Sequence, residues 1–223
     1  MKILYFTDPH FRDTNPVNRL DDFYQKQFDK MKDLVNIRET LKAADIVISG
    51  GDWFDNPTPS YELFNSVLNF ILDLSAEVFS VCGSHDIYGY NMNTLNKSAI
   101  GSLIKVQAIN LLNEEPITLD ACVVKGFSAR KKYSVKDFKL GIKTDKVKII
   151  VAHDPIVTEP VIYDHMLVED IAKVTDADII LCSHIHAQFD VTIKKTRFIN
   201  PGPFTRQSIN EAKMEPKVCL LEI

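Results

Sequence analysis

Aspartate and histidine recur together in five short segments that are spread along most of the 223-residue chain. The segments are Asp8-Pro-His10, Gly51-Asp-Trp-Phe-Asp55, Gly83-Ser-His-Asp86, Ala152-His-Asp154 and Ser183-His-Ile-His186, and they hold five of the six histidines. No single segment is decisive, but together they supply carboxylates and imidazoles from five separate places. A fold that gathers them would form a closed site for two metal ions, which at a separation of about 3.5–4 Å clamp a phosphoryl group for displacement.

The composition is that of an ordinary globular protein, with 45% apolar and 25% charged residues. The length allows residues 1–223 to form a single domain with its own core, and no Gly-, Ser- or Pro-rich linker divides it. The formal net charge of −4 gives no bulk attraction to nucleic acid. Any such contact must come from a local basic patch or from bound metal.

The cysteines and the amino terminus indicate in which cellular compartment the protein is expected. Cys82, Cys122, Cys182 and Cys219 lie far apart in apolar runs, so we expect reduced core residues rather than zinc ligands. The first apolar run is too short for a signal peptide, and no stretch approaches the roughly 20 apolar residues of a membrane helix. The prediction is a cytoplasmic protein without membrane contact.

Short apolar runs alternate with longer stretches of helical periodicity, which favours an α/β fold. We predict strands at Lys2–Thr7, Asp45–Ser49, Val78–Cys82, Cys122–Phe127, Val147–Ala152, Ile179–Cys182, Phe189–Ile193 and Lys217–Ile223. Helices are predicted from Asp21 to Ala44 with Asp21 as the N-cap, from Ser60 to Leu74, and over Val168–Val174.

The candidate ligands follow the predicted strands directly. Asp8, Asp52, His85, His153 and His184 each come at or just after the end of a strand. Since strand carboxyl ends gather at one edge of an α/β sheet, these side chains are expected to converge there.

Local spacing suggests roles within such a site. Asp8 and His10, like His184 and His186, are two residues apart, so in an extended segment both side chains point to the same side. Asp52 follows two glycines in a tight turn and is the best candidate for a bridging ligand, because a carboxylate has lone pairs for two cations. The alternative for Asp52 is a cap or turn residue. His165 has no such context and is predicted to be an ordinary surface residue.

This ordered set of segments resembles that of the calcineurin-like metallophosphoesterases, from Asp8 to the Asn200-Pro-Gly202 turn. Within that family, Gly51–Ser60 and Ser84–Gly89 are most similar to SbcD-type DNA-repair nuclease subunits of phages and bacteria. The resemblance implies a four-layer α/β/β/α sandwich, in which two mixed β-sheets are flanked by helices and the metals lie at one edge.

The resemblance also implies a ligand set. The first metal would take Asp8, His10, Asp52 and His186, and the second would share Asp52 and add Ser84, His153 and His184. His85 matches the histidine beside the leaving group, which acts as general acid or transition-state stabiliser. Asp55 and Asp86 match positions that orient imidazoles through the other ring nitrogen. The reaction implied is attack on phosphorus by a water that bridges the metals, with Asp52 and His85 as the catalytic pair.

Two positions depart from the family pattern. Ser183 replaces a glycine before His184, which is a tolerable exchange of small residues. Ser84 replaces an asparagine that normally gives its amide oxygen to the second metal. Because the serine hydroxyl is shorter, we expect weaker occupancy of that site. Mixed imidazole and carboxylate ligands suit manganese, iron or zinc, and the SbcD resemblance favours Mn²⁺.

The substrate is less well defined by the sequence. Eight basic residues between Arg130 and Lys148 are either a track for a nucleic-acid backbone or a solvated surface. Arg12 and Arg19, in the loop after His10, reach the substrate or belong to an ordinary turn. Tyr88 and Tyr90 stack on a base or pack their own loop.

Three functions therefore remain open: a metal-dependent DNA nuclease, a phosphodiesterase or phosphatase acting on nucleotides or other small phosphoesters, and a non-catalytic binding domain with a degenerate second metal site. For the nuclease, the partners would be DNA and an SbcC-like coiled-coil ATPase, in the host cytoplasm if the chain is phage-encoded. The cap and the ATPase-binding segment of SbcD-type subunits are not visible before Ile223. A homodimer is also left open.

Overall fold

Two β-sheets lie face to face in the structure, a computed structural model that describes residues 1–17, 19–40 and 44–223. The first sheet has the order β13 (Cys219–Glu222), β1 (Lys2–Phe6), β2 (Ile46–Ser49), β3 (Glu77–Ser80) and β4 (Asn110–Leu111). The second has the order β11 (Phe189–Ile193), β12 (Thr196–Asn200), β10 (Ile179–Cys182), β7 (Val147–Ala152), β6 (Cys122–Phe127) and β5 (Ile117–Thr118). Each sheet is mixed. In the first, β13 is antiparallel and the other strands, including the edge strand β4, run parallel. In the second, the two edge strands β11 and β5 are antiparallel to the parallel centre.

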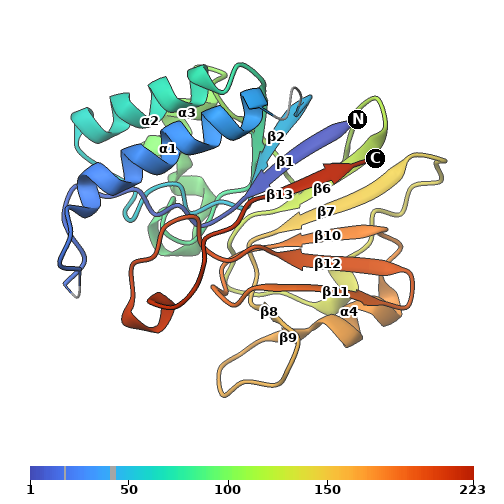
Figure 1. Cartoon of the computed structure of the whole chain (residues 1–223). Helices are drawn as coiled ribbons and strands as arrows, with labels where there is room; N and C mark the ends of the chain where they lie inside the picture. Colours follow the sequence, from blue (N-terminus) through green and yellow to red (C-terminus); the bar gives the residue numbers. More distant parts are fainter. Residues whose placement is uncertain (18, 41–43) are drawn as a thin grey trace.

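Helices cover the outer faces of both sheets (Figure 1). The first sheet is covered by α1 (Phe23–Thr40), α2 (Tyr61–Asp73) and α3 (Ala99–Lys105). The second is covered by α4 (Val168–Val174), beside the small pair β8 (Ile156–Val157) and β9 (Met166–Leu167). The layers are therefore helix, sheet, sheet and helix, as the family resemblance predicted.

Three clusters of buried apolar side chains lie between these four layers. Alternating residues of β1 show the arrangement: Leu4 and Phe6 pack toward the helices, whereas Ile3 and Tyr5 pack toward the second sheet. A third cluster lies between the second sheet and α4. Both sheets are thus buried on both faces, which explains the nearly continuous apolar runs of their central strands.

The predicted strands are all present, and four of them have the predicted bounds, namely Cys122–Phe127, Val147–Ala152, Ile179–Cys182 and Phe189–Ile193. Strand β12 was missed. It pairs antiparallel with β11 around the two-residue loop Lys194-Lys195, in which Lys194 takes a positive φ of 55°. The usual signal for such a turn, Asn-Gly or Asp-Gly, is missing, so nothing in the sequence marked a second strand after Ile193. The seven-residue α3 was missed as well.

The predicted helix starts need one correction. Helix α1 begins at Phe23, and Asp22 caps it by accepting a hydrogen bond from the Gln25 amide at 3.0 Å. The predicted cap, Asp21, instead forms an ion pair with Arg19. Ala44 is not helical, and residues 41–43 of the predicted helix lie outside the described part of the chain. Helix α2 begins as predicted, with the Ser60 hydroxyl accepting from the Leu63 amide at 3.1 Å.

The environments of the cysteines match the prediction, since Cys82, Cys122 and Cys182 are buried, Cys219 is partly buried and all four are free thiols. Within the described ranges, no helix is both long enough and apolar enough to span a membrane.

The contact between the two sheets is testable at Tyr5. Its ring is buried between the sheets, and its hydroxyl donates a hydrogen bond of 2.7 Å to the carbonyl of Cys182 on β10. Tyr5→Phe leaves that buried carbonyl unpaired, so we expect the free energy of unfolding in urea to fall by about 1–3 kcal/mol. The control Tyr61→Phe, at an exposed position, should change it by less than about 0.5 kcal/mol. Equal stability of the two variants would contradict the sheet-to-sheet packing.

Candidate metal centre

The candidate ligands lie where the parallel strands of both sheets end. Asp8 and His10 follow β1, Asp52 follows β2, and His153 and His184 follow β7 and β10. Four of these five residues have a left-handed backbone, with φ of 49° at Asp8, 45° at His10, 52° at Asp52 and 69° at His184. Residues other than glycine rarely adopt this conformation, and when they do they tend to cluster at functional sites.

Backbone hydrogen bonds hold the loops after β1 and β2 side by side. The amides of Asp8, His10 and Phe11 donate to the carbonyls of Gly51, Asp52 and Trp53 at 3.2, 2.9 and 2.8 Å. The ladder continues the parallel pairing of β1 with β2 beyond the end of the sheet. It therefore fixes where the Asp8, His10 and Asp52 side chains lie relative to one another.

Within the described ranges, three groups of side chains each bring their ligand atoms within 4.8 Å of one another. The groups are Asp8, His10 and His186; Asp52, His153 and His184; and His10, Asp52 and His85. The first two groups agree with the two ligand sets that the family resemblance implied. Metal binding by these residues stays a prediction, but the convergence on which it depends is present.

Asp52 lies at the centre of this arrangement. Its Oδ1 accepts a hydrogen bond of 2.7 Å from the His85 amide. Its Oδ2 lies 3.1 Å from His153 Nε2 and 3.6 Å from His10 Nε2, and these imidazoles belong to different ligand groups. This is the position that a bridging carboxylate must occupy.

Ser84 borders the second group through the same carboxylate oxygen. Its hydroxyl lies 3.4 Å from Asp52 Oδ2, and the residue is partly buried. The side chain thus faces the centre, as the family position requires, but carries no amide oxygen.

The histidines are oriented by partners on the side away from the centre. His153 Nδ1 lies 2.8 Å from the Gly50 carbonyl, and His186 Nδ1 lies 2.6 Å from Glu211 Oε1. Because both partners are acceptors, each Nδ1 carries a hydrogen, which leaves Nε2 to face the centre and to offer a lone pair to a cation when the ring is neutral. Such a second bond from a ligating imidazole is typical of metal sites.

The Nε2 atoms that face the centre lie close to other potential acceptors. His153 Nε2 is buried, has no hydrogen-bond partner in the described chain, and lies 3.1 Å from Asp52 Oδ2. His10 Nε2 and His186 Nε2 lie 3.3 Å apart. Acceptors this close repel unless a proton or a cation lies between them. Imidazole and carboxylate donors around such a gap fit divalent ions such as manganese, iron or zinc.

The pKa values of the buried histidines also indicate a site for cations. Burial would lower the pKa of His153, but the adjacent Asp52 carboxylate outweighs it and raises this pKa to about 10. Burial lowers the pKa of His10 to about 3 and, together with the His153 charge, lowers that of His184 to about 4. A positive charge is thus required beside Asp52, and bound cations would supply it in place of a proton.

Two predicted orienting carboxylates have other roles. Asp86 accepts hydrogen bonds from the backbone amides of Trp53 and Gly83 at 2.9 and 2.8 Å. Among the described residues, no imidazole forms a hydrogen bond or ion pair with it. It therefore joins the loops after β2 and β3. Asp55 does orient His85, but through its backbone carbonyl, which lies 2.7 Å from His85 Nδ1. Its carboxylate pairs with Arg12 at 3.3 Å.

Glu211, the partner of His186, was not among the residues predicted from the sequence. This buried carboxylate also accepts from the amides of Gln207 and Ser208 at 2.6 and 3.0 Å. Burial opposes its ionisation, but these bonds and the one to His186 outweigh it and lower its pKa to about 2. A signal was available, because Ser208-Ile-Asn-Glu211 matches a capping box and here caps a short 3₁₀ turn, Ile209–Glu211.

Arg12 and Arg19 were predicted either to reach the substrate or to belong to an ordinary turn, and Arg12 pairs with Asp55, whose carbonyl binds His85. The Arg12 guanidinium joins Asp55 to Gln207, whose Oε1 accepts at 3.2 Å. Both its backbone amide and its carbonyl are bound by the buried Gln27 side chain, at 3.0 and 2.8 Å. His165 forms no part of the described ligand groups, in line with its prediction as a surface residue.

The basic stretch from Arg130 to Lys148 is not one continuous patch. Arg130 lies near the centre, because it pairs with Asp154, the neighbour of His153, at 3.0 Å. Lys146 and Lys148 lie at the opposite end of β7, on the order of 15–20 Å away along the strand. Their amines are bound to the Leu119 carbonyl and to Asp176. Only the first part of the stretch can serve a substrate at the centre.

Comparisons with solved structures agree with this fold. One structure of similar length has a TM-score of 0.61 at 14% identity, covering 99% of this chain and 98% of the other. An archaeal phosphodiesterase has a TM-score of 0.51 at 13% identity, covering 100% and 93%. A Staphylococcus aureus protein provisionally described as a 5′-nucleotidase has a TM-score of 0.58 at 14% identity, covering 91% of this chain and 48% of its own. At these identities the likeness concerns the fold alone.

No curated protein sequence matches the chain significantly. The family model for calcineurin-like phosphoesterases, by contrast, matches residues 1–188, a range that includes all five aspartate and histidine segments. The chain therefore belongs to the calcineurin-like phosphoesterases and is a metal-dependent phosphoesterase.

Proposed function

We propose that the chain is a two-metal phosphodiesterase whose substrate is DNA. The observation that carries this proposal is the position of Asp52 Oδ2 between imidazoles of two ligand groups, with His85 in a third group that shares Asp52 and His10. Asp8, His10, Asp52 and His186 would hold one ion, and Asp52, Ser84, His153 and His184 the other. Bound ions would neutralise the phosphoryl oxygens and lower the pKa of water, and we propose manganese for both sites.

His85 is placed to assist the leaving group. The residue is exposed, and because its Nδ1 faces the Asp55 carbonyl, the Nδ1 carries a hydrogen. Its Nε2 is thereby left to donate a proton to the departing oxygen once the ring is protonated. The His10 ring lies edge-on to it, with ring centroids 4.7 Å apart. The imidazole is therefore held in one orientation at the border between the centre and solvent.

Charge beside the centre supports a polyanionic substrate. Lys131 and Lys132 are exposed and follow Arg130, which is anchored to Asp154. Exposed Tyr88 and Tyr90 follow His85 and offer rings for base stacking. A phosphodiesterase or phosphatase acting on nucleotides is the second candidate, favoured by the fold likeness to a phosphodiesterase and a 5′-nucleotidase. An SbcC-like ATPase partner and a homodimer are further proposals from the family resemblance.

One assay distinguishes the candidates. The chain is supplied with Mn²⁺ and offered single-stranded DNA, duplex DNA, a chromogenic phosphodiester and a phosphomonoester. Cleavage of DNA supports the nuclease, and preference for the monoester supports the second candidate. If the folded, metal-loaded protein hydrolyses none of the four substrates, the proposal is overturned in favour of a binding domain.

Replacing His85 tests the leaving-group role. His85→Ala should reduce turnover by about 10²–10⁴-fold, and most for substrates with poor leaving groups, because general acid catalysis is removed. Metal content measured by mass spectrometry should stay unchanged. The control is His165→Ala, which removes a partly exposed histidine whose Nδ1 lies 2.7 Å from the Tyr163 carbonyl. Loss of the metals, or an unchanged rate, contradicts the role.

Ser84 tests the second ligand set. Since an asparagine amide oxygen reaches farther than a hydroxyl, Ser84→Asn should tighten the weaker of two Mn²⁺ binding steps in a calorimetric titration. Ser66→Asn, at a partly buried position on α2, serves as the control. An identical titration for Ser84→Asn and the unaltered chain would show that Ser84 does not limit metal binding.

A further inference from the structure

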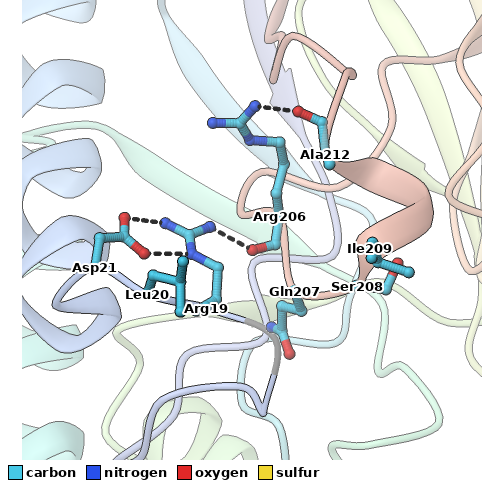
Figure 2. Close-up of a pocket in the computed structure, with 8 residues that line it drawn as sticks. All are labelled: Arg19, Leu20, Asp21, Arg206, Gln207, Ser208, Ile209 and Ala212. Carbon is cyan, nitrogen blue, oxygen red and sulfur yellow. Dashed lines mark hydrogen bonds and ion pairs between the residues drawn. The ribbon is translucent and has the colours of Figure 1, made fainter.

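A pocket of about 330 Å³ lies beside the metal centre, between the loop after β1 and the segment after β12 (Figure 2). It is lined by Arg19, Leu20, Asp21, Arg206, Gln207, Ser208, Ile209 and Ala212. Figure 2 shows the Arg19 guanidinium bridging Asp21 and the backbone carbonyl of Arg206. The two halves of the pocket, nearly 190 residues apart in sequence, are thereby held together.

Gln207 lines the pocket and also contacts a residue of the metal centre. Its Nε2 donates a hydrogen bond of 2.8 Å to the His10 carbonyl, and its Oε1 accepts from Arg12 at 3.2 Å. Its backbone amide donates to Glu211, which orients His186. One lining residue of the pocket therefore contacts both the His10 backbone and the Glu211–His186 pair.

The pocket carries positive charge that the protein does not neutralise. Arg19 is paired with Asp21, but Arg206 Nη1 donates to the uncharged carbonyls of Ala212 and Met214. No carboxylate pairs with Arg206 in the described part of the chain. Lys30 on α1 lies near the same arginines, because their charges, after burial itself, lower its pKa, while Asp33 opposes the change. A partly buried arginine without a counter-ion favours an anionic ligand.

The rim of the same pocket is apolar. Leu20 is fully exposed and Ile209 is 69% exposed, and both line the pocket. Large aliphatic side chains at a cationic pocket offer a surface for a sugar or base while the arginine binds a phosphate. A free inorganic anion would not use this rim.

We propose that this pocket is a subsite for the nucleotide next to the phosphodiester that is cleaved, with its phosphate on Arg206 and its nucleoside against Leu20 and Ile209. The inference rests on the proposed function and extends it, because it makes the substrate a strand at least one nucleotide longer than the reacting group. A small diester reaches the metal centre without entering the subsite.

The test compares two substrates on the full chain loaded with Mn²⁺. Arg206→Gln should reduce kcat/KM for a short single-stranded oligonucleotide by about tenfold to a hundredfold, the range expected for one charge-assisted phosphate contact. For bis(p-nitrophenyl) phosphate, which cannot span both sites, it should stay within about twofold. Arg197→Gln, which removes an exposed arginine paired with Asp190 on β11, is the matched control.

Arg206 also binds the carbonyls of Ala212 and Met214, so its replacement could loosen the loop. A second variant, which keeps these bonds, separates that effect from the loss of a phosphate contact. Lys30→Gln should weaken the oligonucleotide reaction severalfold and reduce its salt dependence, again sparing the small diester. Equal losses on both substrates in both variants, or no loss on either, overturn the subsite.

Failure of the proposed function is recognised separately. If the unaltered chain cleaves neither substrate, fluorescence anisotropy of the labelled oligonucleotide decides the subsite alone. Weaker binding by Arg206→Gln than by Arg197→Gln supports it, and equal binding by all variants overturns it.

Discussion

The carbonyl oxygen of Gly50 is the point at which the two sheets are tied together at the metal edge. It follows β2 in the first sheet and faces His153 Nδ1 and Ser183 Oγ of the second, at 2.8 and 2.7 Å. The approach is so close that a Cβ on Gly50 would lie 2.2 Å from Thr7 Oγ1 and 2.7 Å from Ser183 Cβ. This contact sets how far the Asp8 and Asp52 carboxylates of one sheet lie from the imidazoles of the other.

A site assembled in this way concentrates groups that do not favour one another. Asp8 and Asp52 are both buried, and the pKa of Asp8 is raised by burial, with the neighbouring Asp52 adding to the effect. Left-handed backbone at four ligand positions adds strain, and several nitrogen lone pairs face carboxylate oxygens. Protonation of His153 relieves part of this conflict, and two divalent cations would relieve all of it. These strained backbones and unfavourable contacts lower the stability of the fold. Such features persist at functional sites, so they identify the centre as one.

Much of this centre could be predicted because its ligands follow strands that apolar runs make easy to recognise. Asp8, Asp52, His153 and His184 were placed correctly at one edge without knowledge of the contacts between sheets. Glu211 was missed because its role depends on a loop that returns to His186, and a capping box alone only marks a turn. The roles of Asp55 and Asp86 could not be seen either, since a sequence does not show whether a carboxylate or its backbone makes the contact. Strand β12 escaped because its hairpin turn uses two lysines.

Paramagnetic resonance of the chain titrated with Mn²⁺ reveals whether these residues hold two metal ions close together. Ions about 3.5–4 Å apart are spin-coupled, so a dinuclear centre gives a multiline spectrum that differs from that of isolated Mn²⁺. We expect this coupled spectrum to appear as the second equivalent binds and to be lost in Asp52→Asn, which weakens the bridge. Only uncoupled Mn²⁺ at saturation, or no binding beyond that of the Asp52→Asn variant, would contradict it.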